Sequence, residues 1–313
     1  MIRSVRSTVR RFLSQGQGRR RIEPWMRRLF EIYYDMPFPP THYYSPLPDV
    51  RAVKSNLRRW YKEDTAPGID WNLQQQRELI ERLMPYSSEM NSVPAFNQVT
   101  QDGYGPGYGE VEAHVLYMML RHLKPSRIIE VGSGVSTFYT LTALRTNRER
   151  DNLESTLMCV EPYPNARLRA LVAERQVDLR ECEVQDVGCD VFGELASNDV
   201  LFIDSSHVSK KDSDVDFLFL DVMPRLRQGV VVHIHDITFP MPALPLDHAL
   251  FDAYLFWNEG ALVRAFLSFN AAFKILMCQS YLHYHKPDAL KTLVPLYDSQ
   301  RHFPASLWIT KTA

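Results

Sequence analysis

Cysteine is scarce in this 313-residue chain, and long hydrophobic runs are missing. The four cysteines, at positions 159, 182, 189 and 278, form neither a CxxC pair nor a dense disulfide framework. We therefore expect free thiols and a cytoplasmic location. No window approaches the roughly 18 consecutive apolar residues of a membrane-spanning helix. The N-terminus lacks the apolar core of a secretory signal, although its arginine-rich, acid-poor composition leaves an organelle transit peptide open.

Charge is nearly balanced overall but unevenly distributed along the chain. The formal net charge is −1, yet residues 1–28 carry +8 and the other 285 residues carry −9. Apolar residues recur at helical spacing over residues 1–13, with arginines between them. We expect residues 1–21 to form a separate basic arm, either flexible or locally packed, or in peripheral contact with an anionic membrane or a partner. The acidic remainder argues against a nucleic-acid partner.

The residue pattern changes near position 109. Residues 36–48 hold five prolines, which exclude a regular helix, and residues 22–108 as a whole predict a helical cap with this proline-rich strap. From 109 to 313, short β-branched runs alternate with helical patterns. The expected strands are 127–131, 156–160, 177–182, 200–203, 230–234, 272–277 and 306–310. The expected helices are 109–123, 136–146, 165–174, 212–225 and parts of 247–269. This alternation predicts an α/β fold with a doubly wound, mostly parallel seven-stranded sheet.

The turn after the first expected strand carries two glycines between polar residues. Gly132 and Gly134 permit a tight turn and a close approach of the backbone to a ligand. Glu161 ends the second strand, where a carboxylate can bind both hydroxyls of a ribose. Glu130 would repel a pyrophosphate, and Thr137 stands where a pyrophosphate-binding loop needs glycine. The pattern therefore favours a sulfonium amino-acid nucleoside over NAD.

This turn resembles the first motif of the class I S-adenosylmethionine-dependent methyltransferases, E/D-x-G-x-G-x-G, with Ser136 in place of the third glycine. The resemblance implies a Rossmann-like methyltransferase fold and S-adenosyl-L-methionine as the cofactor. The residues that it implies for cofactor binding are Glu130, Gly132, Ser133, Gly134, Ser136, Glu161, Gln185, Asp186 and Asp204. Among these, Glu161 would bind the ribose, and Gln185 and Asp186 the adenine edge.

From about residue 36 onward the chain also resembles the metal-assisted O-methyltransferases of sugar and secondary-metabolite pathways. Four segments carry this resemblance: residues 42–49, 202–207, 233–237 and 306–309. In such relatives an Asp after the fourth strand and a polar pair after the fifth bind a divalent cation, which here implies Asp204, His235 and Asp236. His235 replaces the usual carboxylate or amide. Mg²⁺, a softer ion such as Mn²⁺ or Zn²⁺, and a histidine base in place of a metal therefore all stay open.

The predicted reaction is methylation of a hydroxyl on a small molecule, a sugar or another metabolite. A cation acidifies the hydroxyl and a base takes its proton, and His207 is the first choice of base, with His235 and Asp236 as further catalytic candidates. His233 lies inside an apolar strand and is expected in the core. Residues 257–259 either line the acceptor pocket or pack and cap a helix. A homo-oligomer is compatible with the sequence, and N-methylation stays open.

Three other interpretations compete with this prediction. The first is an NAD(P)-dependent oxidoreductase, which Glu130 and Thr137 disfavour. The second is a non-catalytic, methyltransferase-like binding subunit whose basic arm engages a partner. The third is a mononuclear iron oxygenase, because His207, His233, His235 and Asp236 offer two-histidine, one-carboxylate ligation.

Overall fold

The computed structural model describes residues 25, 28–29, 31–33 and 42–313, and the predicted basic arm at 1–21 lies outside these described residues. The chain divides into two compact units, Met1–Trp60 and Tyr61–Ala313. The first unit contains α3 (Val50–Ser55), which Asp49 caps through its carboxylate, and α4 (Leu57–Trp60). The predicted borders at residues 21 and 108 stay predictions, and residues 61–108 belong to the same unit as the sheet.

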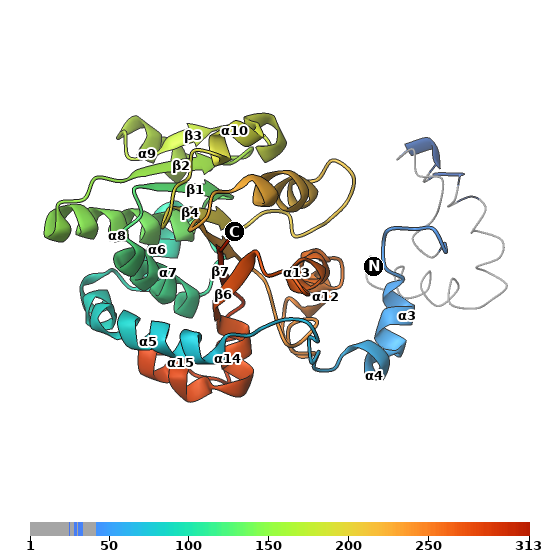
Figure 1. Ribbon diagram of the computed structural model, residues 1–313. Helices are drawn as coiled ribbons and strands as arrows, with labels where there is room; N and C mark the ends of the chain where they lie inside the picture. The colour runs from blue at the N-terminus through green and yellow to red at the C-terminus, as the bar shows by residue number, and fades with distance from the viewer. Residues whose placement is uncertain (1–24, 26–27, 30, 34–41) are drawn as a thin grey trace, which may run out of the picture. The chain divides into compact units, whose positions relative to one another are not determined.

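The second unit is built on a seven-stranded sheet, which confirms the predicted fold class (Figure 1). Its strands are β1 (Arg127–Val131), β2 (Thr156–Val160), β3 (Asp178–Arg180), β4 (Val200–Ile203), β5 (Val231–Ile234), β6 (Phe273–Cys278) and β7 (Leu307–Lys311). They lie in the order β3-β2-β1-β4-β5-β7-β6. Strands β1 to β5 run parallel, and β7 runs antiparallel to both β5 and β6.

Helices occupy most of the connections between the strands. Their bounds are α5 (Leu73–Ser87), α6 (Phe96–Val99), α7 (Glu110–Leu123), α8 (Val135–Asp151), α9 (Ala166–Ala173), α10 (Cys189–Phe192), α11 (Asp214–Asp216), α12 (Phe251–Tyr254), α13 (Glu259–Leu267), α14 (Gln279–His285) and α15 (Pro287–Leu293). The helix predicted at 212–225 is present as a continuous helical segment from 214 to 225, but only α11 is α-helical and the rest continues in π and 3₁₀ turns. Pro224, which has no N–H to donate, lies in the last of these turns. Within the described residues, no helix has the length and apolarity needed to cross a bilayer.

The sheet separates two hydrophobic cores. One core packs α5, α7 and α8 against one face through residues such as Ile128, and the other packs α13 and residues 215–223 against the opposite face through residues such as Ile129. Figure 1 shows α7 and α8 on one side of the sheet and α13 on the other. Strands β4 and β5 are buried on both faces, as expected for the central strands of a doubly wound sheet. The four cysteines are free thiols, as predicted.

The turn between β1 and α8 packs against the end of β4. Gly132 has a φ of +81°, and a Cβ at this position would lie 2.0 Å from the backbone oxygen of Asp204. The two strands are tied at the same point, because the Asp204 N–H donates to the Val131 carbonyl at 2.9 Å. The glycine therefore sets how closely the first turn approaches Asp204.

We expect Gly132→Ala to lower the free energy of unfolding by at least about 2 kcal/mol, because the methyl group clashes with backbone and the positive φ disfavours alanine. Gly134→Ala is the matched control. A Cβ at Gly134 would meet its nearest neighbour, the Tyr104 backbone oxygen, at 3.4 Å, so we expect a loss below about 1 kcal/mol. Urea denaturation of both variants measures the difference, and equal losses would contradict this account of the turn.

Candidate active site

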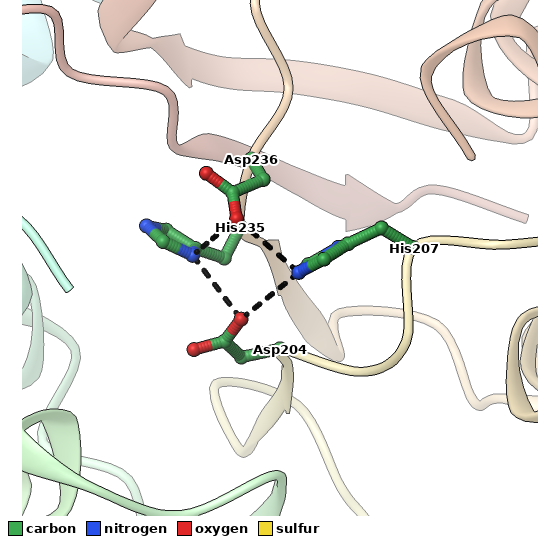
Figure 2. A group of neighbouring side chains, drawn as sticks. All are labelled: Asp204, His207, His235 and Asp236. Carbon is green, nitrogen blue, oxygen red and sulfur yellow. Dashed lines mark hydrogen bonds and ion pairs between the residues drawn. The ribbon is translucent and has the colours of Figure 1, made fainter. Parts of the chain in front are cut away.

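Four polar side chains meet where β4 and β5 end. Asp204 directly follows β4, and His235 and Asp236 directly follow β5. These strands are parallel neighbours, with Ile203 paired to Ile234, so their carboxyl ends lie at the same edge of the sheet. His207 joins them from the loop after β4, and Figure 2 shows all four side chains pointing toward one another. We call these four residues the β4–β5 cluster.

The cluster is compact enough to hold a metal ion. The Asp204 Oδ1 atom lies 3.1 Å from His235 Nδ1 and 3.4 Å from His207 Nε2. The Asp236 Oδ2 atom lies 3.2 Å from His207 Nε2 and 3.4 Å from His235 Nδ1. One donor atom from each residue thus lies within 4.8 Å of all the others. The structure brings together the three predicted metal ligands and adds His207, which the sequence favoured as a base.

Two residues of the cluster have unusual backbone conformations. His207 has a φ of +59° and Asp236 a φ of +57°, both in the left-handed region. This region is unfavourable for residues other than glycine, and such strain is typical of functional sites. The His207 carbonyl accepts hydrogen bonds from the N–H groups of Asn258 and Glu259, each at 3.1 Å. The start of α13 therefore holds the His207 loop in place.

Each histidine of the cluster contacts a buried glutamate through its other ring nitrogen. His207 Nδ1 lies 2.8 Å from Glu259 Oε2, and His235 Nε2 lies 3.2 Å from Glu112 Oε1. Glu259 is 1% exposed and Glu112 is 5% exposed. The same Glu112 oxygen accepts from the Ala305 N–H at 2.8 Å. These two outer carboxylates fix the orientation of both rings.

The sequence did not identify either glutamate in this role. Glu112 lies in the first turn of α7, where an acid is ordinarily explained by the helix dipole. Glu259 belongs to the segment 257–259, for which pocket lining and helix capping were both open. It begins α13, but its carboxylate bonds the His207 ring. Short-range sequence patterns do not predict these contacts, because each one joins segments that are far apart in the chain.

The charges of the cluster stabilise one another. Burial alone would lower the pKa of His207, but hydrogen bonds with Asp204 and Glu259 raise it to about 10. Burial likewise opposes the protonation of His235, while the charges of Asp236 and Asp204 raise its pKa well above the usual range. Against the effect of burial, His235 and His207 hold the pKa of Asp204 well below its usual range. These shifts favour protonated rings that are paired with carboxylates.

Two aromatic residues border Asp236 and His207. The Tyr254 hydroxyl donates a hydrogen bond to Asp236 Oδ1. Burial and the charge of Asp236 raise the pKa of Tyr254, so this hydroxyl stays a donor. The Trp257 ring centroid lies 4.1 Å from that of Tyr254 and 4.5 Å from that of His207. Burial raises the pKa of Asp236, which makes its carboxylate a stronger base than an exposed one.

A cavity of about 550 Å³ opens beyond the ends of β1, β2 and β4. Predicted cofactor residues on its wall are Gly132, Glu161, Gln185 and Asp204. Glu161 accepts the Ser133 N–H at 3.2 Å and so joins the second strand to the first turn. Asp186 shares a 3₁₀ turn with Gln185 but does not line the cavity. The wall also contains Tyr163, Lys210 and Asp214, which the sequence did not assign to the cofactor.

Glu130 lies behind the cavity wall. Its carboxylate is fully buried and accepts a hydrogen bond from the Ser136 hydroxyl at 2.6 Å. The Cys159 sulfur lies 3.6 Å from its other oxygen. Burial raises the pKa of Glu130 to about 7, against the effect of its hydrogen bonds. Ser136, which replaces the third glycine of the motif, thus anchors the start of α8 to Glu130.

A second cavity, of about 340 Å³, lies on the other side of the cluster. His235 and Asp236 form part of its wall, together with the aromatic residues Tyr108, Tyr254, Trp257 and Phe303. Asp204 lines the first cavity and not the second. The β4–β5 cluster therefore lies between a larger cavity at β1–β2 and a smaller aromatic cavity at β5.

His233 is a core residue, as expected from its place in an apolar strand. Its Nε2 atom lies 3.1 Å from the Tyr108 hydroxyl and 3.0 Å from the Ser306 hydroxyl. Its ring stacks on Phe202 at a centroid distance of 4.2 Å. Burial lowers its pKa well below the usual range, so the ring is neutral. The metal-ligand geometry includes His207 and His235 but not His233.

A comparison with protein families finds a match in this region. Residues 129–237 match the family model of a methyltransferase domain. This segment is similar to a methyltransferase domain. It spans about a third of the chain and contains the β1–α8 turn and the whole β4–β5 cluster, whereas Glu112, Tyr254 and Glu259 lie outside it. The match supports the coarser prediction of an S-adenosylmethionine-dependent methyltransferase.

Several known proteins are similar to this chain. An uncharacterized protein of Archaeoglobus fulgidus is 29% identical over 168 residues, which cover 51% of this chain and 75% of that protein. The plantazolicin methyltransferase BamL, solved with a triazolic desmethylPZN analog and SAH, is 13% identical with a TM-score of 0.40, covering 77% of this chain and 99% of that one. A proposed methyltransferase from Thermobifida fusca is 12% identical with a TM-score of 0.44, covering 80% and 96%. The fold of this chain is therefore described from its own strand order and not from these structures.

The raised pKa of Glu130 predicts a pH-dependent stability. With a folded-state pKa of about 7 against 4.5 as reference, the folded domain binds more protons than the unfolded chain between these values. The contribution of Glu130 to the free energy of unfolding therefore falls by up to about 3 kcal/mol as the pH rises from 4.5 to 7. Glu130→Gln lacks this ionisation, so we expect its stability relative to wild type to rise over that range.

Urea denaturation at pH 5, 6, 7 and 8 measures this difference. Glu154→Gln, which changes an exposed glutamate at the opposite end of β2, is the control and should show a nearly constant difference. A constant difference for Glu130→Gln as well would contradict the burial of an ionisable carboxyl at this position.

Proposed function

We propose that this protein transfers a methyl group from S-adenosyl-L-methionine to a hydroxyl of a small molecule, a sugar or another secondary metabolite, with a divalent cation at the β4–β5 cluster. One observation carries the proposal. The cluster separates a cavity at the β1–β2 strand ends from an aromatic cavity at β5, so two ligands can meet at its residues. This arrangement suits direct transfer of a group between them.

The larger cavity suits the cofactor. Glu161 directly follows β2 on its wall, where it can bind the hydroxyls of a ribose, and Gln185 and Asp186 share the turn proposed for the adenine edge. Ser133 and Gly134 belong to the tight turn after β1, beside the place proposed for the methionine part. Carboxylates on the cavity wall favour a cationic sulfonium over a pyrophosphate.

The smaller cavity suits a compact acceptor. A volume of about 340 Å³ accommodates a small molecule and excludes a large chain. The rings of Tyr108, Tyr254, Trp257 and Phe303 provide the apolar surfaces that bind the faces of sugars and planar metabolites. His235 and Asp236 form the wall next to the cluster, so an acceptor hydroxyl can reach both.

The chain supplies donors that fit a divalent cation and a base for the acceptor. Asp204, His235 and Asp236 would hold the ion, which in such sites lowers the pKa of a hydroxyl that it contacts. Asp236 lines the acceptor cavity, where a hydroxyl can reach its carboxylate, so we assign it the hydroxyl proton. Tyr254 holds the Asp236 carboxylate in place through its hydrogen bond.

Calorimetry with S-adenosyl-L-methionine tests the cofactor assignment. We expect Glu161→Ala to weaken binding by at least about tenfold, because a ribose would lose charge-assisted hydrogen bonds worth about 1.5–3 kcal/mol. Glu154→Ala is the matched control, because this exposed glutamate precedes the same strand at its other end and should leave binding unchanged. An absence of binding to S-adenosyl-L-methionine, with retained binding to NAD, would instead support an oxidoreductase.

The basic arm, residues 1–21, is proposed to act separately from methyl transfer. The cluster and both cavities lie within residues 107–305, in the unit Tyr61–Ala313. We therefore expect removal of residues 1–21 to leave the affinity for S-adenosyl-L-methionine unchanged and to abolish any binding to vesicles that contain anionic lipid. A folded truncation that no longer binds the cofactor would show that the arm contributes to the site.

A further inference from the structure

We infer that the β4–β5 cluster is a four-ligand site for a transition-metal ion such as Zn²⁺ in preference to Mg²⁺, and that Glu112 and Glu259 position its two imidazole ligands. The inference rests on the proposed function for the role of the ion beside the acceptor, but not for the binding of the ion. It gives His207 the role of a ligand, where the sequence favoured a base.

The donor set separates the two classes of ion. Two of the four converging atoms are imidazole nitrogens, His207 Nε2 and His235 Nδ1, and the other two are carboxylate oxygens of Asp204 and Asp236. Mg²⁺ prefers oxygen ligands in an octahedral arrangement and usually keeps several waters. Imidazole nitrogen favours zinc and its neighbours in the first transition series. A site with two nitrogen and two oxygen donors therefore selects a transition metal.

The outer glutamates determine which nitrogen of each ring faces the ion. Glu259 hydrogen-bonds Nδ1 of His207 and leaves Nε2 for the cluster, whereas Glu112 forms an ion pair with Nε2 of His235 and leaves Nδ1. The two rings thus contact their glutamates through different nitrogens. The remaining nitrogens, His207 Nε2 and His235 Nδ1, both point to the centre of the cluster. In metal sites a ligating histidine generally donates its other N–H to a carboxylate or carbonyl, which fixes its tautomer and raises its basicity.

The geometry of His207 distinguishes a ligand from a mobile base. Its backbone is in the left-handed region, its carbonyl accepts two N–H groups from the start of α13, and its ring contacts Trp257 and Glu259. Its Nε2 atom lies nearly equally far from Asp204 and Asp236, at 3.4 and 3.2 Å. A side chain held this firmly between two carboxylates is placed as one corner of a coordination site.

Metal binding by the full chain tests the inference directly. Protein is stripped with a chelator, dialysed, and titrated calorimetrically with Zn²⁺, Mn²⁺ and Mg²⁺ without cofactor. We expect one equivalent of Zn²⁺ to bind at least about 100-fold more tightly than Mg²⁺. Co²⁺ provides a second readout, because its visible absorption reports nitrogen and oxygen ligation independently of any activity.

Variants assign the ligands and the positioning residues. We expect His207→Ala to lower Zn²⁺ affinity by at least about 100-fold, and Glu259→Gln and Glu112→Gln to lower it about 10–100-fold each. The isosteric glutamine variants keep the test usable if His207→Ala fails to fold. His248→Ala is the matched control: this histidine lines the β5 cavity but is not in the cluster, so Zn²⁺ affinity should not change.

The outcomes separate this inference from the proposed function. Equal or tighter binding of Mg²⁺, or no binding of any of these ions, overturns the inference. Unchanged Zn²⁺ affinity in a folded His207→Ala protein that has lost methyl transfer identifies His207 as the base and overturns its role as a ligand. One tightly bound Zn²⁺ in a protein that does not bind S-adenosyl-L-methionine supports the metal site and overturns the proposed function alone.

Discussion

Buried and half-buried carboxylates around two imidazole rings are the constraint on which the rest of the site depends. Asp204, Asp236, Glu112 and Glu259 all contact His207 or His235, and isolated buried carboxylates are strongly unfavourable. The two rings must therefore lie where they can neutralise these carboxylates. The fold has to place each carboxylate and each ring accurately. Two rings cannot balance four acids, so the cluster and its two outer glutamates together keep a net negative charge that favours cations.

The fold meets this constraint from both sides of the sheet. Parallel pairing of β4 and β5 brings Asp204, His235 and Asp236 to one edge. Glu112 arrives on α7, which packs in one hydrophobic core, and Glu259 arrives on α13, which packs in the other. The outer carboxylates thus connect the cluster to both cores, and the glutamates come from outside the segment that matches the methyltransferase domain. A change in the packing of either helix would reach the two rings through the Glu259 hydrogen bond and the Glu112 ion pair.

The sequence predicted what depends on short-range patterns. Alternating apolar runs give the strands to within a few residues, and strand ends in a parallel sheet share an edge, so Asp204, His235 and Asp236 could be grouped before the structure. The role of His207 was less accessible, because a loop residue at a positive φ follows no period. Glu112 was missed because an acid in a first helical turn is ordinarily exposed and is explained by its favourable interaction with the helix dipole. Its burial depends on residues 305–306, nearly two hundred positions later in the chain.

The movement of charge in the proposed reaction fits the position of Asp204, which belongs to the cluster and also lines the larger cavity. A sulfonium is cationic before methyl transfer, and the thioether that remains afterwards is neutral, while the acceptor hydroxyl loses a proton. The positive charge therefore leaves the cofactor cavity and reappears as a proton on the acceptor side. Asp204 lines the larger cavity and contacts both rings of the cluster, and Asp236 lines the smaller cavity. In the proposed reaction, the carboxylates of Asp204 and Asp236 lie between the sulfonium and the departing proton. The same two negative groups would therefore stabilise the positive charge before and after the transfer.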